Sequence, residues 1–302
     1  MARSYLASEV IASLKRRALL SSSGTTPFAD SDWLAIMDEE IRTFIWPLLR
    51  EENDGWFLHR HDVAYVTGTT QYRLPARMLG EALKLVEFTI DGTTFLPLPR
   101  LEPTQLARGL VGYWLEDDLL TLAPGVSGIT TMRLMYYLRP SMVVDVANVI
   151  TITSNDGVAT LGGTVGLSFT AAPGDLMDVV SAVPGLRVLQ LDNVVASFTT
   201  PNVTLTDSVA SLPASNAYLC RAEETPVPQI PAEAFPLLAQ SLVTLGLEGR
   251  SGYREAVDRR DALEEQFRTI IKSRSSEGGP NVVQNFHAPG WGGRRGFRGR
   301  YS

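Results

Sequence analysis

Helical periodicity is confined to the two ends of the chain, and this distribution limits the possible folds more than any other feature. Apolar residues recur three and four positions apart over about 6–18, 30–48, 231–247 and 252–273. This spacing gives a helix one apolar face. Between the second and third segments, short alternating runs are separated by Gly and Pro, as in strands joined by turns. Because the helices come from both ends, we expect them to meet in space.

Local signals refine two parts of this pattern. Asp30 or Ser31 can cap the second helix, and Pro47 should kink or end it, because proline lacks the N–H that continues a helix. Within the β-rich part, the run IDGTTF places Asp91-Gly92 between β-formers, which is a hairpin signal.

Residues 146–219 differ in composition from the rest. Arg187 is their one basic residue, and they are rich in Val, Thr, Ser and Gly. Their alternating runs are separated by turns at roughly the spacing of a β-sandwich. We expect a small β-sandwich-like domain inserted into a helical and β host.

The sequence therefore predicts an α+β fold, with a helical bundle built from both chain ends and β-rich regions inserted in it. The expected parts are N-terminal bundle helices over 1–55, a β-rich region over 56–145, the β-sandwich-like domain over 146–219, C-terminal bundle helices over 220–277, and a flexible C-terminal arm over 278–302.

Charge is unevenly distributed along the chain. The net charge is −6, but residues 278–302 hold four Arg and no acid, which leaves 23 basic and 33 acidic residues in 1–277, a net charge of −10. Such asymmetry between a body and its tail indicates a partner that the tail contacts. A body at −10 is a poor surface for nucleic acid.

Cys220 is the single cysteine, so a disulfide within one chain is excluded. The alternation around it indicates a strand, and we expect a buried apolar thiol rather than a nucleophile. No run of about 18 apolar residues occurs, and the amphipathic N-terminus lacks the apolar run of a signal peptide. We expect a soluble protein made in a reducing cytoplasm, without a membrane partner.

The chain offers little that could be catalytic. His59 and His61 would share one face of a strand and could hold a metal with Asp62, but Arg60 lies between them, so solvated residues are the simpler interpretation. GVSG at 125–128 lacks the spacing of a nucleophile elbow and is interpreted as a turn. The triplets 116–118 and 38–40 are interpreted as a polar hairpin turn and a solvated helix face. We expect no enzyme activity, no cofactor and no metal.

The C-terminal segment HAPGWGGRRGFRGRYS is the strongest candidate site. Arg, Trp and Tyr dominate interface hot spots, and glycine lets a backbone enter a crowded groove. Its predicted partner-binding residues are Trp291, Arg294, Arg295, Phe297, Arg298, Arg300 and Tyr301. An alternative of another class is a nucleic-acid-binding protein, with Arg on phosphates and aromatic rings stacked on bases.

Five stretches resemble the head-to-tail adaptor proteins of short-tailed double-stranded-DNA bacteriophages. They are YRLPARMLGEALKLVEF (72–88), FLPLPRLEP (95–103), GYWLEDDLLTLAP (112–124), MRLMYYLRPSMVV (132–144) and TPVPQIPAEAFPLLAQSLV (225–243). The most specific pieces are YYLRPS and PVPQIPAE. The similarity extends from about residue 30 to the end, and the insert 146–219 matches in character more than in residues. After the last helix, IIKSRSSEGGPNVVQNF departs from the basic Pro-Arg-containing segment expected there.

The resemblance implies a structural virion protein of the head–tail junction, assembled in the host cytoplasm. Its subunits, commonly twelve, would form a ring beneath the portal protein, the C-terminal arm would insert into the portal, and the ring would offer a docking surface to the tail or nozzle protein. Viral DNA would pass through the channel without sequence-specific binding. A further alternative is a lectin-like β-sandwich over 146–219, although Phe169 and Phe198 make a poor platform for sugar stacking.

Overall fold

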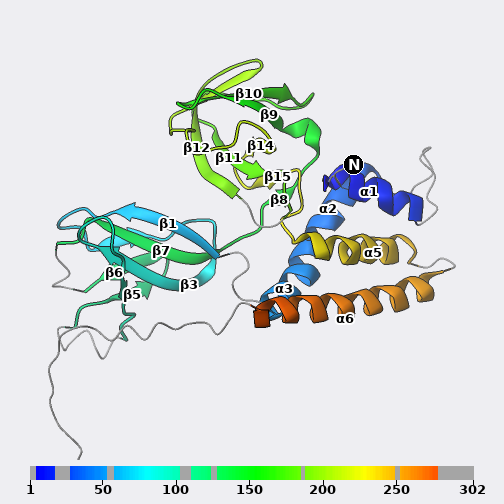
Figure 1. The fold of residues 1–302 in the computed structure, drawn as a ribbon, viewed down its shortest axis with the longest axis horizontal. Coiled ribbons are helices and arrows are strands. Elements are labelled where there is room, and N and C mark those ends of the chain that lie inside the picture. The colour runs from blue at the N-terminus through cyan, green and yellow to red at the C-terminus, as the bar shows by residue number, and fades with distance from the viewer. Residues whose placement is uncertain are drawn as a thin grey trace, which may run out of the picture.

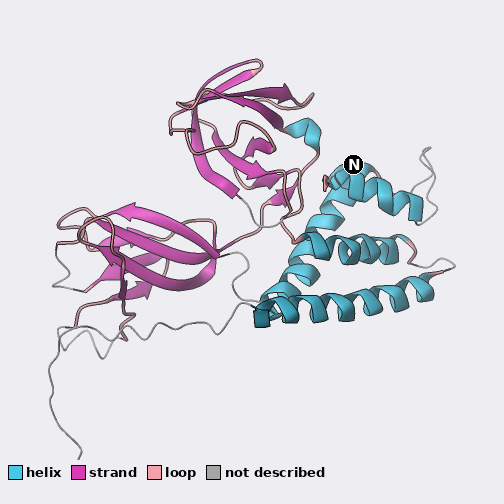
Figure 2. Cartoon of the chain, in the orientation of Figure 1, coloured by secondary structure: helices cyan, strands magenta, loops and turns pink. Residues whose placement is uncertain are grey.

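The structure is a computed structural model, and it describes residues 5–17, 28–52, 58–102, 110–123, 128–184, 188–248 and 252–277. Its elements form three units, which are a layer of helices, a β-barrel and a pair of small β-sheets (Figure 1). The α-helices lie together in one layer apart from the strands, and a short 3₁₀ turn (Val146–Asn148) lies at the barrel (Figure 2).

The helical layer combines segments from the start and the end of the chain. Its elements are α1 (Ala7–Arg17), α2 (Asp30–Glu40), a π-helical turn (Ile41–Ile45), α3 (Trp46–Glu52), a 3₁₀ turn (Ala232–Ala234), α5 (Phe235–Gly246) and α6 (Tyr253–Glu277). They share one apolar core, whose fully buried members include Leu14, Trp33, Met37, Leu238 and Phe267. α1 and α2 bury apolar residues at the expected helical spacing, whereas α5 is buried on nearly every side and Tyr253 and Ile270 on α6 are exposed.

Two local expectations in this layer need correction: the expected cap of the second helix is wrong, and of the two alternatives for Pro47, a kink or an end, the end is wrong. The N-cap of α2 is Ala29, and the carboxylate of Asp32, not Asp30 or Ser31, accepts a hydrogen bond from the Ala29 N–H at 2.8 Å. Pro47 does not end the helical run, because the π-helical turn Ile41–Ile45 precedes it and Pro47 becomes the second residue of α3. Pro47 therefore lies inside a continuous helical run, whose hydrogen-bond pattern changes from α to π just before the residue that lacks an N–H.

Two antiparallel sheets form the second unit. The larger has the strand order β1 (Leu58–Ala64), β7 (Thr131–Leu138), β3 (Met78–Thr89), β4 (Leu96–Leu98), and the smaller has the order β2 (Gln71–Arg73), β6 (Leu119–Leu122), β5 (Tyr113–Glu116). Tyr72, Leu120 and Leu134 belong to their shared core. The predicted Asp91-Gly92 hairpin is confirmed, since β3 pairs with β4 and Gly92 has a φ of +77°.

The third unit is a closed barrel with the strand order β10-β13-β12-β11-β14-β9. Its strands are β9 (Ile150–Asn155), β10 (Thr160–Val165), β11 (Leu176–Ser181), β12 (Val188–Thr199), β13 (Asn202–Leu205) and β14 (Ala217–Arg221). The register of β10 against β9 shifts between Gly162 and Gly163. A Cβ atom on Gly163 would lie 2.0 Å from the carbonyl oxygen of Thr151, so the two backbones approach closely there. A short parallel pair, β8 (Met142–Val143) and β15 (Glu224–Thr225), lies where the chain enters and leaves the barrel.

The predicted fold class is wrong in two respects. Strands make up 35% of the structure and helices 31%, so the molecule is mostly β rather than a helical bundle from both ends that carries β insertions. The 146–219 region is a closed barrel and not a sandwich, because β9 pairs with both β10 and β14 and leaves no open edge. A sandwich and a barrel have the same inward and outward alternation along each strand, so the pattern could not separate them.

Candidate functional site in the described residues

The residues that the sequence favours as a partner-binding site lie outside the described residues. This holds for all seven members of the C-terminal set, Trp291, Arg294, Arg295, Phe297, Arg298, Arg300 and Tyr301. Their role as a partner-binding arm stays a prediction.

On β1, His59 packs against a tyrosine ring, and the nearby Asp62 forms an ion pair. His59 is partly buried, and its ring lies 5.5 Å from that of Tyr136 in an edge-on contact. Burial lowers the pKa of His59, and the nearby charges of His61 and Arg77 lower it further. Both carboxylate oxygens of Asp62 accept hydrogen bonds from the Arg133 guanidinium, at 2.7 and 2.9 Å. Among the described residues, no group of three His, Cys, Asp or Glu side chains could hold a metal ion.

The two acidic triplets have different surroundings. The triplet 116–118 lies at the β5–β6 hairpin, as predicted: Glu116 ends β5, and Asp117, with a φ of +53°, and Asp118 form the turn. Residues 38–40 are less solvated than expected. Asp38 pairs with Arg42 at 2.9 Å and accepts a hydrogen bond from the backbone N–H of Val143, and Glu40 accepts one from the Ser241 hydroxyl.

Cys220 is fully buried on β14, as the sequence predicts. Burial raises the pKa of its thiol well above the ordinary value, and the neighbouring charges of Asp178 and Glu224 act in the same direction. A protonated, inaccessible thiol is a poor nucleophile.

A buried ion pair joins the sheet unit to the barrel. Arg77, in the turn between β2 and β3, donates to Asp178 on β11 over 2.5 Å and to the hydroxyl of Ser141 over 3.0 Å. Asp178 also accepts hydrogen bonds from the backbone N–H groups of Asp192 at 2.9 Å and Glu223 at 3.0 Å. Burial raises the pKa of Asp178, while the Arg77 charge and the backbone donors oppose the rise. We call this group, Arg77, Ser141 and Asp178, the polar joint.

The polar joint continues toward the helical layer. Arg139 pairs with Glu223 at 2.6 Å, and its backbone N–H donates to the carbonyl of Arg77 at 2.9 Å. The backbone N–H of Ser141 donates to the side-chain oxygen of Gln229 at 2.8 Å, and Gln229 belongs to the segment that leads into α5. The polar joint therefore contacts segments that lead to all three units.

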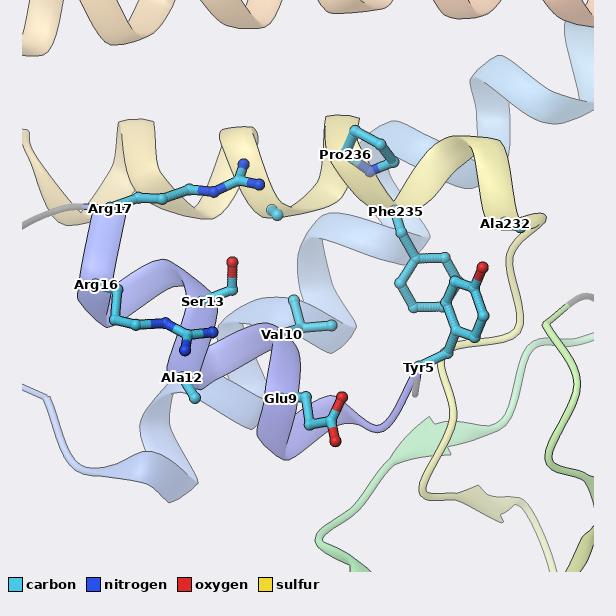
Figure 3. Close-up of a pocket in the computed structure, with 11 residues that line it drawn as sticks. Tyr5, Glu9, Val10, Ala12, Ser13, Arg16, Arg17, Ala232, Phe235 and Pro236 are labelled. Carbon is cyan, nitrogen blue, oxygen red and sulfur yellow. The ribbon is translucent and has the colours of Figure 1, made fainter. Parts of the chain in front are cut away.

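A groove of about 730 Å³ lies between α1 and α5 (Figure 3). The rings of Tyr5 and Phe235 meet edge-on at one end, with centroids 4.8 Å apart. Glu9, Arg16 and Arg17 on α1 place both signs of charge along it. This mixed lining selects no class of ligand by charge.

A smaller pocket of about 270 Å³ is lined by apolar side chains and by charged groups of one sign only, which are carboxylates. Its apolar part comes from Phe28, Trp33 and Ile36 on and before α2 and from Leu245 on α5, and its polar part is Glu39, Glu40, Thr43 and Glu248. The Trp33 ring is 1% exposed and meets Phe28 edge-on at 5.2 Å. The Trp33 indole N–H is buried and has no hydrogen-bond acceptor in the part of the chain that the structure describes. We call these eight residues the acidic pocket.

Sequence reasoning missed both the polar joint and the acidic pocket. Arg77 and Asp178 are far apart in the chain, and neither stands in a recognisable motif. Two parts of the acidic pocket were visible separately, as the 38–40 triplet and the apolar face of the second helix, but Leu245 and Glu248 come from the other end of the chain.

None of the described helices has both the length and the apolar composition for crossing a membrane. Comparison with known proteins finds no protein family whose model matches this chain, and no curated protein whose sequence matches it.

Proposed function

We propose that this protein is a structural subunit of a bacteriophage virion, a head-to-tail adaptor. Its copies form a ring beneath the portal protein, the arm over 278–302 docks into the portal, and the ring receives the tail or nozzle protein. Viral DNA passes through the ring without sequence-specific contacts. The protein works in the virion neck after assembly in the host cytoplasm, and it performs no chemistry of its own.

The observation that carries the proposal is that five stretches resemble such adaptors in the same order along the chain. Three of these stretches also meet at the polar joint. Arg77 belongs to 72–88, Ser141 to 132–144 and Gln229 to 225–243, and these three residues are linked by hydrogen bonds at the polar joint. The most specific stretches therefore contribute to the contact between units rather than to a catalytic cleft. This is what a structural role requires, because the units must keep a fixed arrangement while partners hold them.

The charge distribution is a second support. A body at −10 would repel DNA that passes along it, while the arm has four arginines and three aromatic rings for a partner surface. Ordering the arm costs about 1–2 kcal/mol per residue, so the aromatic side chains must supply much of the binding free energy.

The test is co-purification of the full chain with cognate portal rings, followed by native mass spectrometry. We expect a complex of ring stoichiometry with the full chain and none after deletion of 287–302. Trp291→Ala should weaken the complex more than Arg298→Gln, because exposed ion pairs contribute little. Tight binding by the deleted protein would refute the anchoring role. Single-strand binding that falls steeply with salt and disappears on deletion would instead favour a nucleic-acid-binding protein.

A further inference from the structure

We propose that the acidic pocket binds the arginine- and aromatic-rich end of the same chain, residues 287–302, while no other partner holds it. The proposal goes beyond the adaptor function and does not depend on it. It assigns a ligand class, a cationic aromatic peptide, to a pocket that combines an apolar floor with carboxylates.

The first support is the composition of the pocket. Glu39 and Glu248 are exposed at its rim, and neither has an ion-pair partner among the described residues. Glu40 accepts one hydrogen bond, from Ser241, which leaves its second oxygen for another donor. Three carboxylates around an apolar floor match a planar guanidinium, which pairs with carboxylates through its edge and packs on aromatic rings through its face.

The second support is the Trp33 indole. Its N–H is buried and lacks an acceptor in the described residues, and a buried donor without an acceptor is unfavourable. A peptide brings backbone carbonyl oxygens as acceptors, and one of them reaches this covered N–H only when the side chains around Trp33 move aside. A free metal ion or a small amine would not supply one.

The third support is charge complementarity within one sequence. Residues 287–302 carry Arg294, Arg295, Arg298 and Arg300 with no acid, and they include Trp291, Phe297 and Tyr301. No other stretch of this length in the chain combines four basic residues, three large aromatic residues and no acidic residue. The glycines between them allow the backbone to lie close to the pocket rim.

The fourth support is reach. The carbonyl of Ala256 on α6 accepts hydrogen bonds from Gln240 and Thr244 on α5, which places the start of α6 near the pocket end of α5. From there α6 continues to Glu277, about 32 Å farther along its axis. Residues 278–291 can span about 46 Å when extended, so Trp291 can return to the pocket of its own chain. A tethered ligand that can span the distance meets its own pocket at a higher effective concentration than a dilute second copy does, which favours this arrangement over binding between copies.

The test is a distance measurement by electron paramagnetic resonance on the full chain. Spin labels are placed at Ala35→Cys, on an exposed position of α2 beside the pocket, and at Gly299→Cys in the arm. The native Cys220 is fully buried and will not react. We expect a narrow distribution of short distances that is unchanged when the labelled protein is diluted with unlabelled protein.

Two double variants test this result, one by removing charges from the pocket and the other by removing charges from the arm. Glu39→Gln/Glu248→Gln and Arg294→Gln/Arg295→Gln should each cause a several-fold loss of the short-distance population. The matched control, Glu116→Gln/Glu265→Gln, removes the same charge from exposed positions outside the pocket and should change nothing. Circular dichroism of each variant confirms that the fold is retained.

A broad distribution in the parent protein, or equal loss in the control variant, would overturn the proposal. A short-distance population that disappears on dilution would show that the arm binds a neighbouring copy, which also contradicts binding within one chain. Loss of portal binding in the co-purification assay leaves this result untouched, since the distance is measured on the chain by itself, with no portal protein present.

Discussion

The core of the helical layer and the contact between the barrel and the sheet unit depend on different kinds of interaction. The helical core consists of apolar side chains such as Leu14, Met37 and Phe267, which the periodicity of each helix presents on one face. The barrel is closed by backbone pairing around its own apolar core, and the buried charged contact that attaches it to the sheet unit is the polar joint. Apolar packing accommodates small errors of geometry, whereas a buried ion pair stabilises only when its geometry is good. The polar joint should therefore be more sensitive than the helical core to small changes of geometry.

The largest expected effect is on the helical side. Phe267→Ala should lower the free energy of unfolding by about 3–5 kcal/mol, because it leaves a cavity in the core of the helical layer. Ile270→Ala, on the same helix but 41% exposed, should change it by about 0.5 kcal/mol. Urea unfolding followed by circular dichroism at the helical band measures both. Equal losses would show that α6 is not held by its buried face.

The polar joint should show strong coupling between its two charged residues. Arg77→Met should cost about 3 kcal/mol, the lower end of the range for breaking a buried pair, because Asp178 can take up a proton when its partner is lost. Asp178→Asn added to this variant should cost much less than it does alone. A double-mutant cycle by urea unfolding measures the coupling. Additive losses would contradict a direct joint between sheet and barrel.

The smallest effect concerns closure of the barrel. Gly163→Ala should cost about 1–3 kcal/mol, because the new methyl group would collide with the carbonyl oxygen of Thr151, which is backbone. Gly162→Ala should cost less, since its close neighbours are the side chains of Asn202 and Ser154, which can move. Thermal unfolding of the two variants checks this order. The reverse order would show that backbone approach at the bulge does not limit closure.

The parts of the fold that were predictable are those with a local cause. The helical segments, the Asp91-Gly92 hairpin and the burial of Cys220 follow from periodicity and turn chemistry over a few residues. The start of α2 and the continuation past Pro47 were not predictable, because Asp30, Ser31 and Asp32 all have side chains that can cap a helix, and proline in a helix interior usually breaks or kinks it. The candidate arm could be named from composition alone, and its role stays a prediction.

Sequence by itself determined which faces of the helices are apolar, where strands alternate, and that positive charge gathers in the last 16 residues while the body is acidic. Only the tertiary structure decided that β9 would close a barrel, that Arg77 would meet Asp178, and that Glu39 and Glu248 would share one pocket with Trp33. The physical reason is range. Periodicity and turn preferences act between neighbours in the chain, whereas strand closure, ion pairing and pocket formation join residues that approach each other only when the whole chain is folded.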